Sequence, residues 1–243
     1  MMPATNWQSP PAGPSLGPSD VHVWRLALAQ APDQLARFAG TLSADEVDRA
    51  ARFHFDRDRN AYTATRGALR ALAAHYAGCT PGALTFGYRD RGKPYLSAPA
   101  GDLRLNVSHS GGYALLAFTR GRELGVDVEH KRPLFELGSL AEASFSPAEY
   151  AAWCRLPPPD RLDAFFAIWS RKEAFIKATG EGVAQLAEFD VSVRADEPAR
   201  LLRMPGGVPW RLYDLPAIAE YSAAIVVPGD GIAIHCFDWP PAR

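Results

Sequence analysis

The chain has 243 residues, of which 47% are hydrophobic and 22% charged, and its formal net charge is -1 at pH 7. This is the composition of a globular protein with enough apolar surface for a core. The near-zero net charge provides no long-range field that would favour nucleic acid or an anionic membrane, so a phosphate site must be a local cluster. No apolar run is long enough to cross a bilayer.

The first twenty residues are rich in proline and show no basic-then-apolar pattern. We therefore expect residues 1–20 to be a flexible tail rather than a signal peptide. The three cysteines, Cys79, Cys154 and Cys236, form no CxxC pair. An odd number of scattered cysteines indicates reduced thiols and predicts a cytoplasmic protein.

The first half of the chain predicts one long helix and several strands. Residues 21–28 alternate as a strand, and Ser43 with Glu46 forms a capping box that opens a short helix. A long helix is expected over residues 59–77, ended by Gly78. Further strands are predicted at 84–86, 103–107 and 113–118, the last two joined by a turn at Gly111-Gly112.

The second half repeats this order. A strand is expected at residues 124–129, a capping box at Ser146 and Glu149, and a long helix at 161–179 ended by Gly180. Strands follow at 189–193, 210–213 and 221–227.

The spacings of the two halves agree. The strand-to-cap interval is 20 positions in both (43 − 23 and 146 − 126), and the cap-to-glycine interval is 35 (78 − 43) and 34 (180 − 146). We predict an α+β fold of two pseudo-two-fold-related halves, residues 21–120 and 121–243, each a long helix on a small, mostly antiparallel sheet. Residue identity between the halves is poor, so a chance similarity of order is the alternative. Two halves would form a cleft, a common place for a ligand.

Two carboxylates, Asp127 and Glu129, are two positions apart in a strand and therefore share one face. Like charges on one face are tolerated beside a cation or at an exposed edge. Oxygen ligands suit Mg²⁺, which often bridges to phosphate. A solvent-exposed strand face is the alternative.

The segment 169–177 places Trp169, Glu173 and Lys177 on one helix face at steps of four. Glu173 and Lys177 could be an ordinary surface pair worth about 0.3–0.5 kcal/mol. With Asp127 and Glu129 they provide three carboxylates and a lysine, a set that suits metal-assisted phosphoryl transfer. Trp169 is interpreted as a packing residue that fixes the helix.

The remaining polar groups are less specific. Residues 106–112 could offer backbone amides and an imidazole to a phosphate, or form a simple hairpin turn. Ser108 and His109 are adjacent and do not form a hydrolase pair. The other histidines show no metal-ligand spacing and are interpreted as structural or surface residues: His22, His54, His75, His130 and His235.

Four motifs in order resemble the 4′-phosphopantetheinyl transferases, in particular their two-halved, monomeric surfactin-type branch. They are Gly92-Lys93-Pro94, Asn106-Val107-Ser108-His109, Gly125-Val126-Asp127-Val128-Glu129 and the segment from Trp169 to Lys177. The resemblance implies Mg²⁺, coenzyme A, and an acyl or peptidyl carrier protein as acceptor, with adenosine 3′,5′-bisphosphate released.

The resemblance also implies roles for individual residues. Asp127, Glu129 and Glu173 match the family's metal ligands, with Glu173 taking the serine proton, directly or through a water. Lys177 matches the lysine on the pyrophosphate. The implied coenzyme contacts are Lys93, Ser108 and His109, together with Arg49 and Arg66, which flank a stretch, Phe53 to Thr65, whose spacing varies in the family.

Two other functions stay open. One is a coenzyme A-binding module without transfer activity, and the other is a Mg²⁺-dependent phosphodiesterase or nuclease. The second class usually offers more acidic or histidine ligands, and the net charge does not support nucleic-acid binding.

Overall fold

The computed structural model describes residues 6–89, 92–99, 101–182, 185–204 and 206–239. The helices are α1 (Pro32–Ala39), α2 (Ala44–Ala51), α3 (Asp56–Ala77), α4 (Leu137–Ser144), α5 (Pro147–Cys154) and α6 (Arg161–Thr179). The strands are β1 (Asp20–Ala27), β2 (Thr85–Tyr88), β3 (Pro94–Ala98), β4 (Leu103–Ser110), β5 (Tyr113–Arg120), β6 (Gly125–His130), β7 (Asp190–Val191), β8 (Leu201–Arg203), β9 (Trp210–Asp214), β10 (Tyr221–Pro228) and β11 (Ala233–Asp238). Short 3-10 turns lie at Pro81–Ala83 and Pro158–Asp160.

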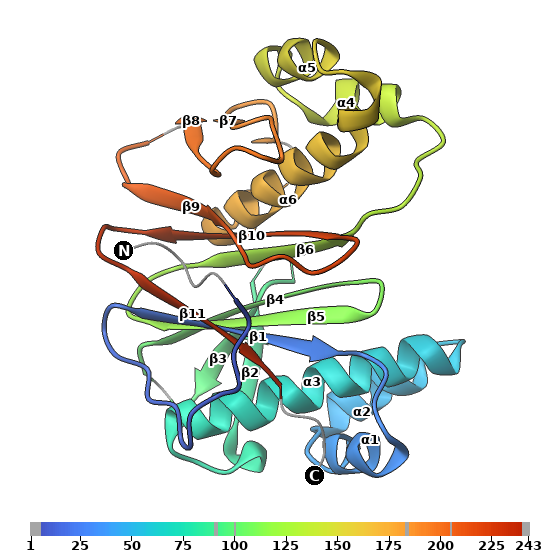
Figure 1. Ribbon diagram of the computed structural model, residues 1–243. Helices are drawn as coiled ribbons and strands as arrows, with labels where there is room; N and C mark the ends of the chain where they lie inside the picture. The colour runs from blue at the N-terminus through green and yellow to red at the C-terminus, as the bar shows by residue number, and fades with distance from the viewer. Residues whose placement is uncertain (1–5, 90–91, 100, 183–184, 205, 240–243) are drawn as a thin grey trace.

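Two sheets lie at the centre of the molecule, each covered by one long helix (Figure 1). The first sheet has the strand order β11-β1-β5-β4 and the second β6-β10-β9. Helix α3 packs on the first sheet and α6 on the second, as the two apolar clusters on the outer sheet faces show. A third cluster joins the inner faces of both sheets. The predicted α+β class, with a long helix on a small, mostly antiparallel sheet in each half, is confirmed.

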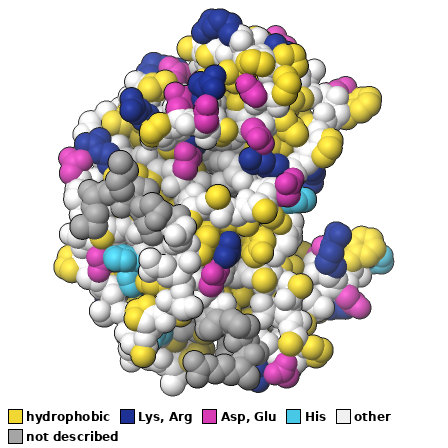
Figure 2. Space-filling model, viewed as in Figure 1, with side chains coloured by type: hydrophobic (Ala, Val, Ile, Leu, Met, Phe, Trp, Pro, Cys, Tyr) yellow, Lys and Arg dark blue, Asp and Glu magenta, His cyan; other side chains and the backbone are white. Residues whose placement is uncertain are grey.

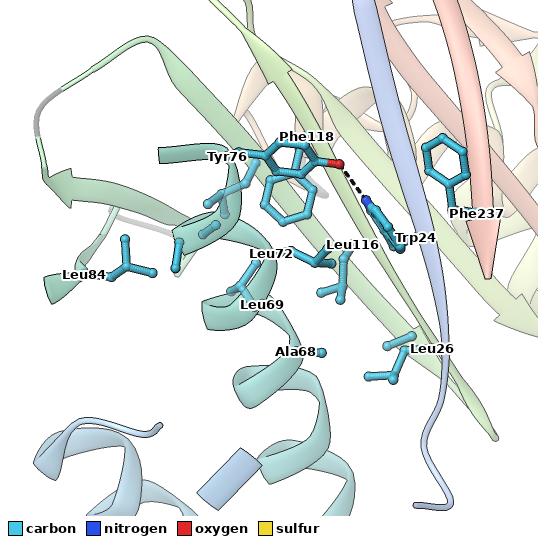
Figure 3. Packing of buried hydrophobic residues seen from close by; sticks show 14 of the residues in the cluster. Trp24, Leu26, Ala68, Leu69, Leu72, Tyr76, Leu84, Leu116, Phe118 and Phe237 are labelled. Atoms are coloured by element: carbon cyan, nitrogen blue, oxygen red, sulfur yellow. Dashed lines mark hydrogen bonds between the residues drawn. The ribbon is translucent and has the colours of Figure 1, made fainter. Parts of the chain in front are cut away.

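The first apolar cluster shows why α3 binds its sheet. Leu69, Leu72 and Tyr76 lie on one helix face, at steps of three and four, and meet Leu116 and Phe118 of β5 (Figure 3). Charged side chains of both signs are interspersed over the face shown in Figure 2, in keeping with the small net charge. No helix within the described ranges combines the length and the apolar character needed to cross a membrane.

Two predictions about the ends of the chain are wrong. Residues 6–20 are not a flexible tail: Trp7 Nε1 donates to Pro216 O at 3.1 Å, Gln8 N donates to Cys236 O at 2.9 Å, and Leu16 is buried. Residues 1–5 of that predicted tail lie outside the described residues. The last strand, β11, is not in the second half, because it pairs in parallel with β1 at the edge that β5 leaves free.

Most predicted elements are confirmed, with small shifts. Helix α6 spans the predicted residues, whereas α3 begins at Asp56, three residues before the predicted start. Gly78 and Gly180 end these helices with φ of 66° and 79°, a left-handed conformation that glycine adopts without strain. The strand predicted at 189–193 is only the two-residue β7, and α1, α4, β3, β8 and β11 were not predicted. The pseudo-two-fold relation of the halves stays a prediction.

Candidate active site

The two sheets meet along β4 and β6 through side chains instead of a backbone ladder. Alternate residues of β4 face the edge of β6, and their side-chain oxygens accept hydrogen bonds from its amides. The acceptors are Asn106 Oδ1, Ser108 Oγ and Ser110 Oγ, with donors Val126 N, Val128 N and His130 N at 2.9, 3.4 and 3.1 Å. We call these three β4 residues the side-chain ladder. It fixes β6, and with it the carboxylates of Asp127 and Glu129, relative to the first sheet.

Asp127 is 1% exposed, and one of its oxygens is paired. Its Oδ1 accepts hydrogen bonds from Ser108 Oγ at 2.8 Å and from Lys177 Nζ at 2.5 Å. Lys177 Nζ also donates to Ser108 Oγ at 3.0 Å. The other oxygen, Oδ2, is buried without a hydrogen-bond partner among the described residues. A buried carboxylate oxygen left unpaired is costly unless a cation or a donor completes it.

Both oxygens of Glu129 are held by hydrogen-bond donors. Ser110 Oγ donates to Oε2 at 3.0 Å and Trp169 Nε1 donates to Oε1 at 3.1 Å. Burial first, and then the neighbouring Asp127 carboxylate, raise the pKa of Glu129. Trp169 therefore does more than pack: its indole orients a carboxylate of the site.

Glu173 lies on α6, one turn before Lys177, and is only partly exposed. Its burial raises the pKa of Glu173 to about 7; the Lys177 ammonium opposes this rise, while Asp127 and Glu129 add to it. The three carboxylates thus act on one another electrostatically, as the sequence predicted from two separate elements. At neutral pH a carboxyl group with such a pKa can both accept and release a proton.

A cleft of about 640 Å³ opens beside these groups, a volume typical of small-molecule sites. The first half contributes β3, β4 and the turn before β3, and the second half contributes the end of α6. The lining residues are Gly92, Lys93, Pro94, Asn106, Val107, Glu173, Ile176, Lys177, Gly180 and Gly182. Residues from both predicted halves therefore line this cleft, and its role as a boundary between two subdomains stays a prediction.

Lys93 lines this cleft, but its ammonium already has partners. Nζ donates to Glu123 Oε2 at 3.1 Å and to Leu124 O at 3.0 Å. Burial lowers the pKa of Lys93, and Glu123 partly restores it. His109 lies near the end of β4 and is exposed, and desolvation of its ring together with the Lys177 charge lowers the pKa of His109. A neutral His109 can offer both a donor and an acceptor to a ligand.

Arg49 and Arg66 do not line the cleft. Arg66 is buried, with Nε donating to Glu46 Oε1 at 2.6 Å and its guanidinium 4.4 Å from the Phe86 ring centroid. Its Nη2 is buried with no hydrogen-bond partner in the described part of the chain. Arg49 is exposed, 5.5 Å from the Tyr62 ring centroid. Their role as coenzyme contacts stays a prediction.

The carboxylates fit a hard divalent cation by chemistry. Asp127, Glu129 and Glu173 offer only oxygen ligands, and Asp127 Oδ2 is a buried acceptor without a hydrogen-bond partner among the described residues. The ligand atoms of these three carboxylates do not all lie within 4.8 Å of one another. Among the described residues, a different group of side chains meets that distance. A shared ion would therefore require the carboxylates to approach one another.

The sequence analysis missed two residues that orient the Glu129 carboxylate. Ser110 was not singled out, and Trp169 was interpreted as a packing residue. The signal for Ser110 was present, because Asn106, Ser108 and Ser110 alternate on one strand face, as ladder residues must. No sequence pattern could show that the Trp169 indole reaches Glu129, because these residues are 40 positions apart.

Comparison with known proteins agrees with this geometry. Residues 123–226 match the 4'-phosphopantetheinyl transferase superfamily, and residues 29–120 match the amino-terminal domain of 4'-phosphopantetheinyl transferases. The chain is 40% identical to the 4'-phosphopantetheinyl transferase HetI of Nostoc over 97% of this chain and 96% of that one. It is 30% identical to a 4'-phosphopantetheinyl transferase of Bacillus subtilis, over 78% of this chain and 83% of the relative.

The chain therefore belongs to the 4′-phosphopantetheinyl transferase family, and it is an enzyme of that class. The family recognised from four sequence motifs is confirmed. These matches do not establish the surfactin-type branch, since identity to the transferase Sfp of Bacillus subtilis is 27% over 66% of this chain and 70% of that protein.

Proposed function

We propose that this chain transfers the 4′-phosphopantetheine arm of coenzyme A to a serine of an acyl or peptidyl carrier protein and releases adenosine 3′,5′-bisphosphate. One observation carries the proposal: Glu173 and Lys177 line a cleft of about 640 Å³, and they interact there with the carboxylates of β6, Lys177 through a hydrogen bond to Asp127 and Glu173 through the charges of Asp127 and Glu129. The names of the relatives support the same reaction.

The reaction is an in-line displacement at phosphorus. The serine oxygen forms a bond to the phosphorus that carries pantetheine, and the bond from that phosphorus to the bridging pyrophosphate oxygen breaks. The serine proton must leave, and the bisphosphate must depart with its negative charge stabilised. Positioning and electrostatic stabilisation provide most of the catalysis in such transfers.

Glu173 is placed to take the serine proton. It lines the cleft, and in the absence of a cation burial raises the pKa of Glu173 to about 7, which makes it a stronger base than an ordinary carboxylate. Whether the proton passes directly or through a water depends on where the serine lies.

Lys177 is placed to stabilise the leaving bisphosphate. It lines the cleft, and Asp127 Oδ1 and Ser108 Oγ hold its ammonium in one position. A phosphate can approach the third hydrogen of the ammonium, because a lysine has three donors. Lys93 and His109 are the further coenzyme contacts that this proposal includes, with Ser108 acting through Lys177 as well.

Mg²⁺ is the cation that we propose for Asp127, Glu129 and Glu173. When bound, it would withdraw charge from the pyrophosphate and help to hold the coenzyme. The protein's contribution is the arrangement of the ligands: Ser108 and Lys177 position Asp127, and Ser110 and Trp169 position Glu129.

We further propose that the protein acts as a monomer of the surfactin-type branch in the cytoplasm. Matches to an amino-terminal and a carboxy-terminal family region within one chain support a site completed without a second copy. The three cysteines are free, which suits a reducing compartment.

Intact-protein mass spectrometry tests the function. Purified protein with Mg²⁺ and coenzyme A should add the mass of the phosphopantetheine arm to an apo carrier domain. Asp127→Asn and Glu173→Gln should abolish the mass gain, whereas Glu188→Gln, an exposed glutamate outside the cleft, should not. No mass gain on a panel of fatty-acid, polyketide and peptide carriers, with a known transferase as positive control, would sink the proposal.

Two outcomes would identify the alternatives. Calorimetric binding of coenzyme A without turnover on any carrier would indicate a binding module. Hydrolysis of coenzyme A or of a phosphodiester in the absence of carrier would indicate a phosphodiesterase.

A further inference from the structure

A group of side chains with the chemistry of metal ligands lies on the first sheet, outside the cleft. The ligand atoms of Asp20, His22 and His235 all lie within 4.8 Å of one another. These residues are far apart in the sequence, since His235 is 215 positions from Asp20 (235 − 20). They meet because β11 returns to pair in parallel with β1, which places His235 directly beside His22.

Strand geometry explains why all three side chains share one side of the sheet. Asp20 and His22 are two residues apart on β1, so they point to the same face. His235 is in register with His22 on the neighbouring strand and therefore lies on that face too. The two imidazole centroids are 5.4 Å apart, and His235 Nε2 is 3.7 Å from Asp20 Oδ1.

The hydrogen bonds of His22 leave one ring nitrogen available. Its Nδ1 is 2.7 Å from Tyr76 Oη, and Trp24 Nε1 donates to the same oxygen at 2.9 Å (Figure 3). Nε2 makes no hydrogen bond to the described residues. A histidine whose other ring nitrogen is fixed by a neighbour is the usual arrangement of a metal ligand.

The remaining two ligands are also suitably placed. Gly17 N donates to Asp20 Oδ2 at 2.9 Å, which orients the carboxylate and leaves Oδ1 facing His235. His22 is 4% exposed, whereas the side chains of His235 and Asp20 are 45% and 31% exposed. An ion can therefore enter from the His235 side and bind against a rigid, buried imidazole.

We propose that Asp20, His22 and His235 form a second metal site, for a transition ion of the Zn²⁺ class, that ties the first strand to the last. Two imidazoles and one carboxylate are a ligand set that Zn²⁺ accepts, with water in the fourth position. The nitrogen ligands separate this site from the oxygen-only site of the cleft. The cleft is lined by β4, and β5 separates β4 from β1 in the sheet. The proposed ion would therefore lie away from the cleft and take no part in the transfer reaction.

The proposed ion acts on stability. It would cross-link two strands from the two ends of the sequence, and a ligand that binds only the folded state stabilises that state. The melting temperature should rise by about 5–10 °C when free Zn²⁺ exceeds its Kd a hundredfold.

The test uses untagged full-length protein titrated with Zn²⁺ in excess Mg²⁺, so that the carboxylate site of the cleft does not contribute. Calorimetry should give one Zn²⁺ per chain, and calorimetry with Co²⁺ should be accompanied by the visible absorption of a nitrogen-containing tetrahedral site. His235→Gln and Asp20→Asn should each weaken Zn²⁺ binding at least about tenfold and reduce the Zn²⁺-dependent rise in melting temperature. Both side chains are partly exposed, so these variants should fold.

His54→Gln is the matched control, because His54 is an exposed histidine just before α3 and is not part of the group formed by Asp20, His22 and His235. It should bind Zn²⁺ as the wild type does. No stoichiometric binding, or binding that His235→Gln and His54→Gln change equally, would overturn the proposal. Carrier modification measured in parallel should be unchanged in His235→Gln, so this result is independent of the proposed function.

Discussion

Lys172 Nζ donates to both carboxylate oxygens of Glu149, at 2.9 and 2.7 Å, inside the second half of the molecule. Neither side chain is more than 1% exposed, and Phe189 O accepts a third hydrogen bond from Nζ at 2.8 Å. Adjacent helix residues point about 100° apart, so Lys172 anchors α6 to α5 while Glu173 faces the cleft. The pair therefore holds in place the helix that carries Glu173 and Lys177.

Lys172→Met should lower the free energy of unfolding by about 3–5 kcal/mol, because it leaves the Glu149 charge buried without its cation. Urea denaturation measures the change. Lys131→Met is the control: its pair with Asp163 spans 2.9 Å, but the Asp163 side chain is 59% exposed, so the loss should be below about 1 kcal/mol. Similar losses in the two variants would refute the anchoring role of Lys172.

Glu46 should make stability depend on acid pH. Burial by itself would raise the pKa of Glu46, but hydrogen bonds and charges from Arg70 and Arg66 outweigh burial and lower it below 4.5. The unfolded chain therefore takes up the proton first as pH falls. The stabilisation is complete above pH 4.5 and is lost as pH falls through the folded-state pKa.

Glu46→Gln should consequently be less stable at pH 7 and should lose less stability than the wild type below pH 4.5. Urea unfolding over a pH series measures both effects. Glu188→Gln, which changes an exposed glutamate, should keep the wild-type pH dependence. An unchanged acid dependence in Glu46→Gln would contradict the assignment.

Gly125→Ala should disrupt the packing of β6 against α6. A Cβ at position 125 would lie 2.1 Å from Ala174 O and 2.3 Å from Ala178 N, and these backbone atoms cannot move without displacing the helix that carries Glu173 and Lys177. We expect a loss of at least about 1–3 kcal/mol together with reduced transfer.

Gly138→Ala is the control for that change, because nothing lies within 4 Å of the added Cβ and the residue is in α4. Alanine should be neutral there or stabilise by about 0.5–1 kcal/mol. Thermal denaturation of the two variants compares them. A Gly125→Ala protein as stable as Gly138→Ala would disprove the close strand–helix contact.

Asn106→Ala tests the side-chain ladder. The buried amide of Val126 would lose its acceptor, at a cost of about 1–3 kcal/mol. Ser97→Ala removes an exposed hydrogen bond to Thr85 O and should cost less than about 0.5 kcal/mol. If chemical denaturation shows equal stability for both, the ladder does not join the sheets energetically.

Trp169→Phe tests how Glu129 is oriented. Phenylalanine preserves the stacking on Phe165 but removes the hydrogen bond to Glu129 Oε1. We expect intact folding, a higher Mg²⁺ concentration for half-maximal activity and a transfer rate lower by about tenfold or more. Trp210→Phe, on β9, should leave the Mg²⁺ dependence unchanged. A Trp169→Phe protein with the wild-type Mg²⁺ dependence would show that Trp169 only packs and does not orient Glu129.

The local sequence determined helices α2, α3, α5 and α6, most strands and the chemistry of the cleft. The glycine stop signals Gly78 and Gly180, the capping boxes and the alternation around Asp127 act over a few residues, so they can be read directly. The four motifs likewise identified the family and placed Glu173 and Lys177 beside Asp127 and Glu129.

The tertiary structure alone determined the contacts between residues that are far apart in the sequence. Trp169 meets Glu129, Glu123 engages Lys93, and the side-chain ladder joins two strands, all through contacts between separate elements. Residues 233–238, which the sequence assigned to the second half, form β11 in the first sheet because this strand pairs with the free edge of β1. That pairing alone brings His22 and His235 together, since histidines so far apart in sequence become neighbours only when backbone hydrogen bonding fixes the register of their strands.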